Sequence, residues 1–313
     1  MTAIRIRNCL DVRIVSLGIY SSTPWSSGRG IRCENCNLTK VLDTYIENQF
    51  LCLSTDSAGL VVRDGYWGPS PDGTAVLLGE TQSGSESTEV HIDNLVVDWA
   101  FAATPTHAMY GLRIRHASGV WVSNSDFIHA IYGLFIDPPS GRYVNFGFFA
   151  NCAWDSAADR CIFISPGAGG FVSSLVFTNC WSASCQYDTC AIAGPVDGVQ
   201  FVGHRFFNSQ HGNGLWVHGT SKNIMVDSCF SSGNINGWGY VFEAGSKKFA
   251  LRNSLSGPSG GPFLTTFPPN KYGAYIGPSS SDYIVTSNML KGNALLSLSD
   301  GGLGPKAVAN NLL

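Results

Sequence analysis

The stretch GLWVHGTSKNIMVDSCF, Gly214 to Phe230, contains two short alternating runs separated by a polar corner. Apolar residues take every second position, with Leu215 and Val217 in the first run and Ile224 and Val226 in the second. A period of two is the pattern of a β-strand that buries one face. The stretch therefore predicts two short strands that turn through a corner and share one buried side.

The same unit recurs along the chain, and its inward residues form two columns. The column near the end of each first strand is Ile114, Ile136, Ile164, Ile192, Val217, Phe242 and Ile276. The second-strand column is Val122, Phe146, Phe177, Phe201, Val226, Leu251 and Val285. The two columns keep step, at intervals of roughly 25 residues, which is typical of a repeat architecture.

Strands this short need neighbours, because each must bury one face. Coils of three short strands stacked on one another satisfy this requirement and pair every backbone group along the stack. We therefore predict an all-β fold, a single-stranded right-handed parallel β-helix with coils of about 25 residues. The coils are expected over residues 1–290, with irregular insertions near 57–87 and 256–273, and residues 291–313 are expected to form a C-terminal closing segment.

Composition excludes several classes of function. Charged residues make up 13% of the 313 residues, the net charge is −3, and Lys and Arg do not cluster. Binding to nucleic acid through phosphates is therefore not expected. The chain has no apolar run of about 18 residues and its first residues, MTAIRIRNCLDVRI, have no signal-peptide core. We expect neither a membrane span nor a signal peptide within this sequence.

The ten cysteines are irregularly spaced. CENC, Cys33 to Cys36, has the spacing of half a zinc or redox site, but no second half-site follows. We expect no metal and no cofactor, and interpret the cysteines as buried free thiols in a chain that folds in the cytoplasm. A further inward column falls at a corner of the coil and is interpreted as structural: Ser125, Cys180, His204, Cys229 and Ser254.

The outward residues of the first strands carry the chemistry. The position after the inward column includes Arg115, Asp137, His218 and Glu243, and stacking predicts the pairs Arg115–Asp137 and His218–Glu243 about 4.8 Å apart. The outward neighbours include four aromatic residues, Phe135, Phe163, Trp216 and Tyr275. Sugar recognition needs an apolar platform for the C–H face of a ring and polar groups for its hydroxyls. Trp216, Phe163, Phe135 and Arg115 are therefore the candidate substrate-binding residues.

The candidate catalytic residues are Glu243, His218, Asp227 and Asp137. Glycoside hydrolysis needs two carboxyl groups, about 5–5.5 Å apart for retention or about 6.5–9.5 Å apart for inversion. Glu243 is one candidate; its possible partners are Asp227, on another strand, and Asp137, four coils away. A lyase needs a base, a role that His218 could fill.

A purely structural role for these outward residues is the alternative. Outward charges on a β-helix are usually solvated, outward aromatics often cover a loop or a neighbouring subunit, and Asp227 with Arg252 fits a simple ion pair. Asp126, Asp155 and Asp159 lie in corners or loops where an active site could equally sit.

With these units, the chain resembles the pectin-lyase-like β-helix superfamily, and within it bacteriophage tailspike and tail-fibre proteins. The repeats GLRIRHASGVWVSNSDF (111–127) and GLWVHGTSKNIMVDSCF (214–230) are similar to the weak repeats of such proteins. The tail from Gly273 to Leu313 resembles their closing segments. Pectate lyases carry clustered calcium-binding aspartates, and polygalacturonases carry Asn-Thr-Asp, Asp-Asp and Gly-His-Gly motifs. This sequence contains only GHR at 203–205, so neither catalytic set is carried over.

The resemblance implies a tailspike or tail-fibre protein that binds, and could depolymerise, a bacterial surface polysaccharide. It also implies a homotrimer and a place in the virion or outside the cell. Two alternatives remain: a secreted polysaccharide lyase, hydrolase or epimerase, and a non-enzymatic structural or adhesive β-helix. Whether the protein is an enzyme is left open by the sequence.

Overall fold

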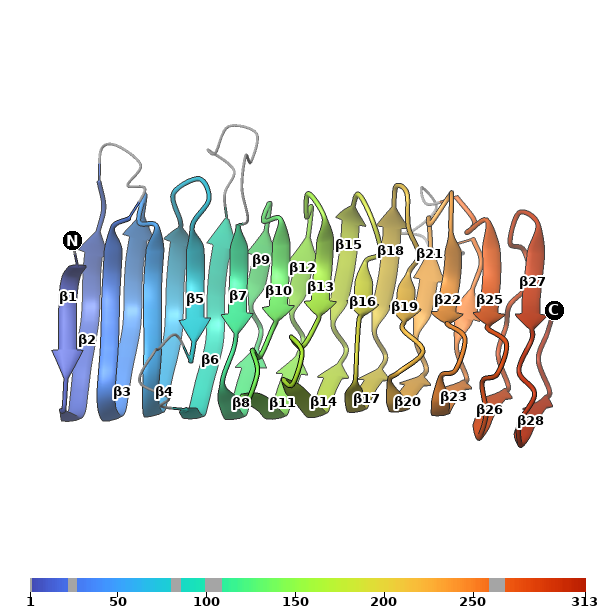
Figure 1. The fold of residues 1–313 in the computed structure, drawn as a ribbon. Helices are drawn as coiled ribbons and strands as arrows, with labels where there is room; N and C mark the ends of the chain where they lie inside the picture. The colour runs from blue at the N-terminus through green and yellow to red at the C-terminus, as the bar shows by residue number, and fades with distance from the viewer. Residues whose placement is uncertain (1, 22–26, 80–85, 99–108, 259–267) are drawn as a thin grey trace.

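The computed structural model describes residues 2–21, 27–79, 86–98, 109–258 and 268–313. They form a right-handed parallel β-helix in which successive coils lie side by side, with the N-terminus at one end and the C-terminus at the other (Figure 1). The predicted fold class is confirmed.

Each coil has three faces, which we name a, b and c in chain order, and each strand pairs in parallel with its equivalents in the coils before and after it. Face a contains β1 (Thr2–Arg7), β5 (Thr74–Leu78), β7 (Tyr110–Ile114), β10 (Tyr132–Ile136), β13 (Arg160–Ile164), β16 (Cys190–Ile192), β19 (Leu215–Val217), β22 (Trp238–Phe242), β25 (Tyr272–Ile276) and β27 (Leu296–Asp300). Face b contains β8 (Ala117–Ser123), β11 (Tyr143–Ala150), β14 (Phe171–Thr178), β17 (Val196–Val202), β20 (Lys222–Asp227), β23 (Lys247–Arg252), β26 (Tyr283–Thr286) and β28 (Lys306–Ala309).

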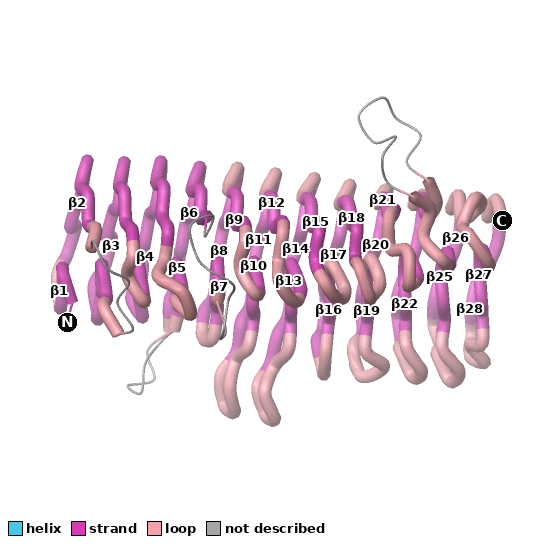
Figure 2. The backbone as a smooth tube through the Cα atoms, turned by 90° about the horizontal axis from the view of Figure 1, so that it is seen from above, coloured by secondary structure: helices cyan, strands magenta, loops and turns pink. Residues whose placement is uncertain are grey.

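Face c contains β9 (Asp126–Ile128), β12 (Ala153–Asp155), β15 (Trp181–Cys185), β18 (Arg205–Ser209), β21 (Phe230–Ser232) and β24 (Leu255–Ser256). Near the N-terminus the strands are longer and bend around corners: β2 (Leu10–Ile19) and β6 (Ser87–Asp98) cover faces b and c, and β3 (Arg29–Glu47) and β4 (Leu51–Gly68) cover all three. Because these strands pass through the corners, the three ladders join into one 28-stranded sheet. Seen from above, the coils stack at regular intervals along the axis (Figure 2).

The interior is filled by the predicted inward columns. The face a column pairs in register from Ile114 through Ile136, Ile164, Ile192, Val217 and Phe242 to Ile276, and every member is fully buried. The corner residues Ser125, Cys180, His204, Cys229 and Ser254 are buried as expected. Nine of the ten cysteines are buried free thiols, and the tenth, Cys9, is partly exposed.

The predicted face b column is wrong at one position. Phe149, not Phe146, pairs with Val122 and Phe177, and Phe146 is 52% exposed. The cause is the left-handed backbone of Phe146, with φ 54°, which interrupts the alternation and moves every later side chain of the strand to the other side. Gly119 and Ser174 have the same conformation at this level of the neighbouring coils, so the irregularity belongs to the repeat.

A second line of left-handed residues makes the corner between faces b and c. Its members are Asp43, Asp64, Asn94, Asn124, Asn151, Asn179, Gly203, Ser228 and Asn253. Asn, Asp and Gly tolerate φ > 0 better than other residues. This explains why the corner after each face b strand is polar although the inward residues of the strand are apolar.

Asn179 offers a test of this corner, because it has φ 51°, is exposed, and its backbone N–H bonds to the Val202 carbonyl of the next coil. We expect Asn179→Val to lower the free energy of unfolding by roughly 1–2 kcal/mol, since a β-branched side chain opposes this backbone conformation. Asn179→Gly is the matched control and should change stability by less than about 0.5 kcal/mol. Equal urea midpoints for the two variants would contradict this explanation of the corner.

The structure corrects the expected insertion near 57–87. Residues 57–68 belong to β4 and residues 74–78 form β5, and both pair in register with neighbouring coils; residues 80–85 lie outside the described residues. The insertion expected near 256–273 falls largely on residues 259–267, also outside them. Strands β27 and β28 pair with β25 and β26, so the expected closing segment continues the coil. None of the described ranges contains a helix long and apolar enough to cross a membrane.

Candidate functional site

The outer side of face a brings Trp216, His218 and Glu243 together. Trp216 points outward from β19 because its neighbours Leu215 and Val217 point inward, and Glu243 directly follows β22 in the next coil. Trp216 Nε1 donates a hydrogen bond of 2.9 Å to Glu243 Oε1. His218 Nε2 lies 4.0 Å from Glu243 Oε2, so the predicted His218–Glu243 stacking is present.

This cluster is open to solvent, and its side chains can still form hydrogen bonds with a bound molecule. The side chains of His218 and Glu243 are 43% and 39% exposed. The rings of Trp216 and His218 meet edge to face at 5.8 Å, and His218 Nδ1 lies 3.3 Å from the Thr220 hydroxyl. A carboxylate and an imidazole at this separation can exchange protons with a bound molecule, one as acid and the other as base.

Asp137 lies far from this cluster. The pairings β10–β13–β16–β19–β22 place it four coils from Glu243, roughly 19 Å at about 4.8 Å per coil. Its main partner is Arg113, whose Nε lies 3.0 Å from Oδ1, and Arg115 is more distant at 3.8 Å. Burial raises the pKa of Asp137, and the hydrogen bond from Arg113 opposes that rise. The predicted Arg115–Asp137 pair is therefore secondary to an Arg113–Asp137 pair.

Asp227 belongs to another face. It ends β20 on face b, where Arg252 Nη2 lies 2.7 Å from Oδ2 and Asn253 Nδ2 lies 3.0 Å from Oδ1. The structure does not bring Asp227 together with Glu243. Asp126 and Asp155 lie on face c, in β9 and β12; burial raises the pKa of Asp126, and Asp155 accepts the Ser156 N–H at 2.6 Å.

Phe135 and Phe163 form part of a stacked aromatic group on face a. Their ring centroids are 5.3 Å apart with planes 13° from parallel, and Tyr132 stacks on both. Tyr110 extends the group by one coil, stacking on Phe135 at 5.3 Å, and the Arg113 guanidinium lies 4.6 Å from the Tyr110 ring centroid. Two of the four predicted binding residues thus share one aromatic surface.

Three aromatic residues missed by the sequence analysis as binding candidates extend this surface beyond Trp216. Trp238 stacks on Tyr272 at 4.4 Å and lies 5.3 Å from Tyr275. Trp238 and Tyr272 occupy the first positions of β22 and β25 and pair in register. A separate column made of the first residue of each face a strand would have identified Trp238 and Tyr272.

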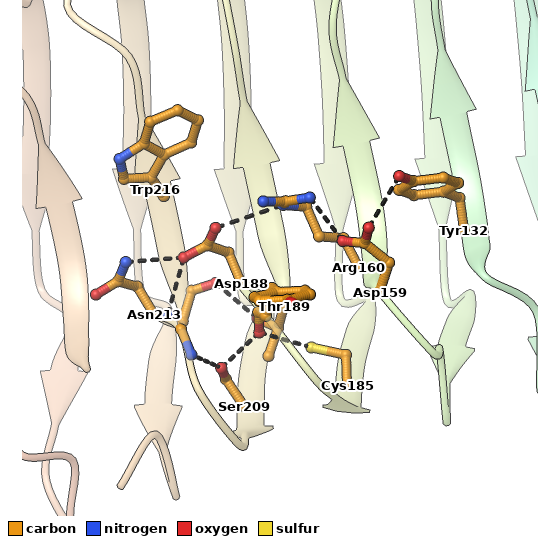
Figure 3. A network of polar contacts seen from close by, with 12 residues as sticks. Tyr132, Asp159, Arg160, Cys185, Asp188, Thr189, Ser209, Asn213 and Trp216 are labelled. Atoms are coloured by element: carbon orange, nitrogen blue, oxygen red, sulfur yellow. Dashed lines mark hydrogen bonds and ion pairs between the residues drawn. The ribbon is translucent and has the colours of Figure 1, made fainter. Parts of the chain in front are cut away.

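A polar network crosses face a between the two aromatic groups (Figure 3). Arg160 contacts Asp159 at 2.6 Å and Asp188 of the next coil at 3.4 Å. Asp188 also accepts the backbone N–H and the side-chain amide of Asn213, at 2.9 and 2.8 Å. Figure 3 shows Trp216 beside this network. Because Asp188 is buried and already has these donors, its role is to fix the strand starts of three successive coils.

Asp159, one of the corner candidates, also belongs to this network. The Tyr132 hydroxyl donates to it at 2.9 Å. Burial, with Asp159 next in importance, raises the pKa of Tyr132 to about 12, so the hydroxyl remains a donor at neutral pH. In the part of the chain that the structure describes, no three His, Cys, Asp or Glu side chains gather as a metal site would require.

Comparisons with known proteins identify the fold. No protein-family model matches the chain, and no curated protein sequence matches it. Among solved structures, the periplasmic alginate epimerase AlgG is similar with a TM-score of 0.65 and 13% identity, over 96% of this chain and 77% of that one. The Dettilon tailspike protein is similar with a TM-score of 0.51 and 11% identity, over 80% of this chain and 60% of that one. At these identities the likeness establishes the parallel β-helix and nothing finer.

Proposed function

We propose that this protein is a tailspike-like component of a bacteriophage, which binds a bacterial surface polysaccharide along face a and depolymerises it. The observation that carries the proposal is the Trp216–His218–Glu243 cluster, which shares face a with one aromatic group on β7, β10 and β13 and another on β22 and β25. A polysaccharide is a linear polymer, and aromatic groups spaced along the axis of the helix offer it successive contacts.

The aromatic residues supply the apolar platforms and the neighbouring ionisable groups supply hydrogen bonds. Tyr110, Tyr132, Phe135 and Phe163 lie at one end of this surface, and Trp238, Tyr272 and Tyr275 lie at the other. Glu243 lies in the coil of Trp238 and His218 in the coil before it, and both have free capacity for a proton transfer. Asp188 and Asp137 lie on the same face but are committed to arginine partners.

Two solved structures with this fold are named as a tailspike and as an alginate epimerase. Those names agree with a polysaccharide ligand and with a place in the virion or outside the cell, and the homotrimer expected of a tailspike belongs to the same proposal. Because the likeness concerns the fold alone, the proposal depends on the chemistry of face a.

Trp216→Ala tests the binding surface. We expect this variant to weaken binding roughly tenfold or more, because buried aromatic contacts dominate recognition surfaces. The measurement is binding to a panel of purified capsular polysaccharides and lipopolysaccharides. The matched control is Trp121→Ala on face b, where Trp121 stacks on His91 at 4.7 Å far from the cluster. Equal losses of polysaccharide binding in the two variants would mean that the binding site is not at Trp216.

A paired assay separates the alternatives. Reducing ends without an ultraviolet-absorbing product indicate hydrolysis, and the two together indicate elimination by a lyase. Binding without any cleavage would support the non-enzymatic adhesive alternative. An absence of both binding and cleavage across the panel would overturn the proposal.

A further inference from the structure

A groove separate from face a runs along the corner between faces b and c in the N-terminal coils. Its volume is about 550 Å³, within the range of roughly 300–1,000 Å³ that is usual for ligand sites. Two carboxylates, Asp43 and Asp64, and two tyrosines, Tyr45 and Tyr66, are among the residues that line the groove. None of these four residues lies on face a.

The two tyrosines form a stacked aromatic platform, and the paired position in the preceding coil carries no side chain. Tyr45 and Tyr66 pair in register in β3 and β4, and their rings stack at 5.7 Å with planes only 8° from parallel. They are 43% and 37% exposed. The residue that pairs with Tyr45 in the preceding coil is Gly18. The ring stack therefore stops at Tyr45, whose second face looks toward a position that carries no side chain.

The space at that position is open. A Cβ placed on Gly18 would come within 4 Å of only one atom of the described residues, Cδ1 of Tyr20 at 4.0 Å. Among the described residues other than its chain neighbours, nothing therefore fills the position beside the open face of Tyr45. The Tyr45 hydroxyl donates to Glu47 Oε2 at 2.8 Å, which helps hold the ring in place.

The polar side of the groove is acidic. Asp43 accepts the Ser16 hydroxyl at 2.7 Å, and Asp64 accepts the Asn94 amide at 2.8 Å. Each carboxylate has four lone-pair sites, so both retain acceptor capacity toward the groove. No Lys, Arg or His lines it among the described residues. A negatively charged ligand is disfavoured here, and hydroxyl or amino donors are favoured.

We propose that this groove is a second carbohydrate site, which binds one sugar ring without negative charge on the face of Tyr45 left open by Gly18, with an amino sugar preferred. The ring extends the tyrosine stack by one member, and its hydroxyl or amino groups donate to Asp43 and Asp64. The site is independent of the function proposed for face a, because the two surfaces share no residue.

The experiment is saturation-transfer NMR of the intact chain with three probes: chitosan tetrasaccharide, cellotetraose and tetragalacturonate. We expect transfer to the first two, stronger for chitosan tetrasaccharide, and none to tetragalacturonate at this groove. Gly18→Phe fills the open position with a ring, and Tyr45→Ala removes the platform. Each should reduce binding of chitosan tetrasaccharide about three- to tenfold, as expected for loss of one stacked contact.

A matched control makes the outcome decisive. Ala307→Phe adds the same ring at an exposed position of β28 and should leave binding unchanged. Binding that survives Gly18→Phe but is lost in Trp216→Ala would overturn this second site and still support the site on face a. Absence of transfer to both chitosan tetrasaccharide and cellotetraose would overturn the second site and leave the face a proposal untouched. Unchanged melting temperatures of the variants exclude unfolding as the cause of any loss.

Discussion

Replacing Phe177 with alanine is expected to reduce the free energy of unfolding by about 3–5 kcal/mol. Phe177 is fully buried on face b, between Phe149 at 4.6 Å and Phe201 at 5.0 Å, with all three rings nearly parallel. Each coil contacts mainly its neighbours, so the cavity in one coil also removes contacts from the coils on both sides. Urea or thermal unfolding followed by circular dichroism measures the loss.

The matched control for Phe177→Ala is Phe148→Ala. Phe148 lies in the neighbouring coil on the same face but points outward and is 38% exposed. We expect its replacement to cost less than that of Phe177, about 1–2 kcal/mol, because Phe148 lies on the outer surface and its removal leaves no cavity in the interior. Similar losses for Phe148 and Phe177 would mean that the inward assignment of the face b column is wrong.

The second large effect is expected at Glu243. If the cluster on face a is the reacting centre, Glu243→Gln should lower polysaccharide cleavage by about 10²- to 10⁴-fold, the usual contribution of a general acid or base. The glutamine keeps an oxygen that can accept the Trp216 N–H, which now bonds to Glu243 at 2.9 Å. Polysaccharide binding should therefore persist while cleavage is lost. His218→Ala is expected to cause a comparable loss of cleavage.

Asp227→Asn is the control for the charge change. It removes a carboxylate of the same kind that pairs with Arg252 on face b, away from the cluster. Cleavage should be unchanged, and stability should fall by about 1 kcal/mol, because the asparagine loses the charge of a pair at the surface but keeps an acceptor oxygen. Cleavage that is retained in Glu243→Gln but lost in Asp227→Asn would move the reacting centre to face b.

The errors in the sequence analysis have a common physical origin. Phe146 was placed inside because a period of two was counted through a left-handed residue that the composition of YVNFGFFA does not reveal. The insertion near 57–87 was expected because the polar runs STDS (54–57) and RDG (63–65) suggest a loop, whereas β4 turns its corners there and keeps its pairing with the neighbouring coils. In both cases left-handed residues change the course of the strand while its pairing with neighbouring coils continues: Phe146 in β11, and Gly59 and Asp64 in β4.

The sequence alone determined the coil, its inward columns and its polar corners, because stacking demands the same kind of residue at the same place in every turn. It also placed Trp216, His218 and Glu243 on one outward face, since their distances follow from the register. The sequence also predicted the pairs His218–Glu243 and Asp227–Arg252, and only the tertiary structure decided the other outward contacts. Arg113 reaches Asp137 in preference to Arg115, Arg160 joins Asp159 to Asp188, and Gly18 leaves one face of Tyr45 open. Outward side chains are free of the stacking constraint, so their partners depend on corner lengths and side-chain reach, which a repeat pattern does not encode.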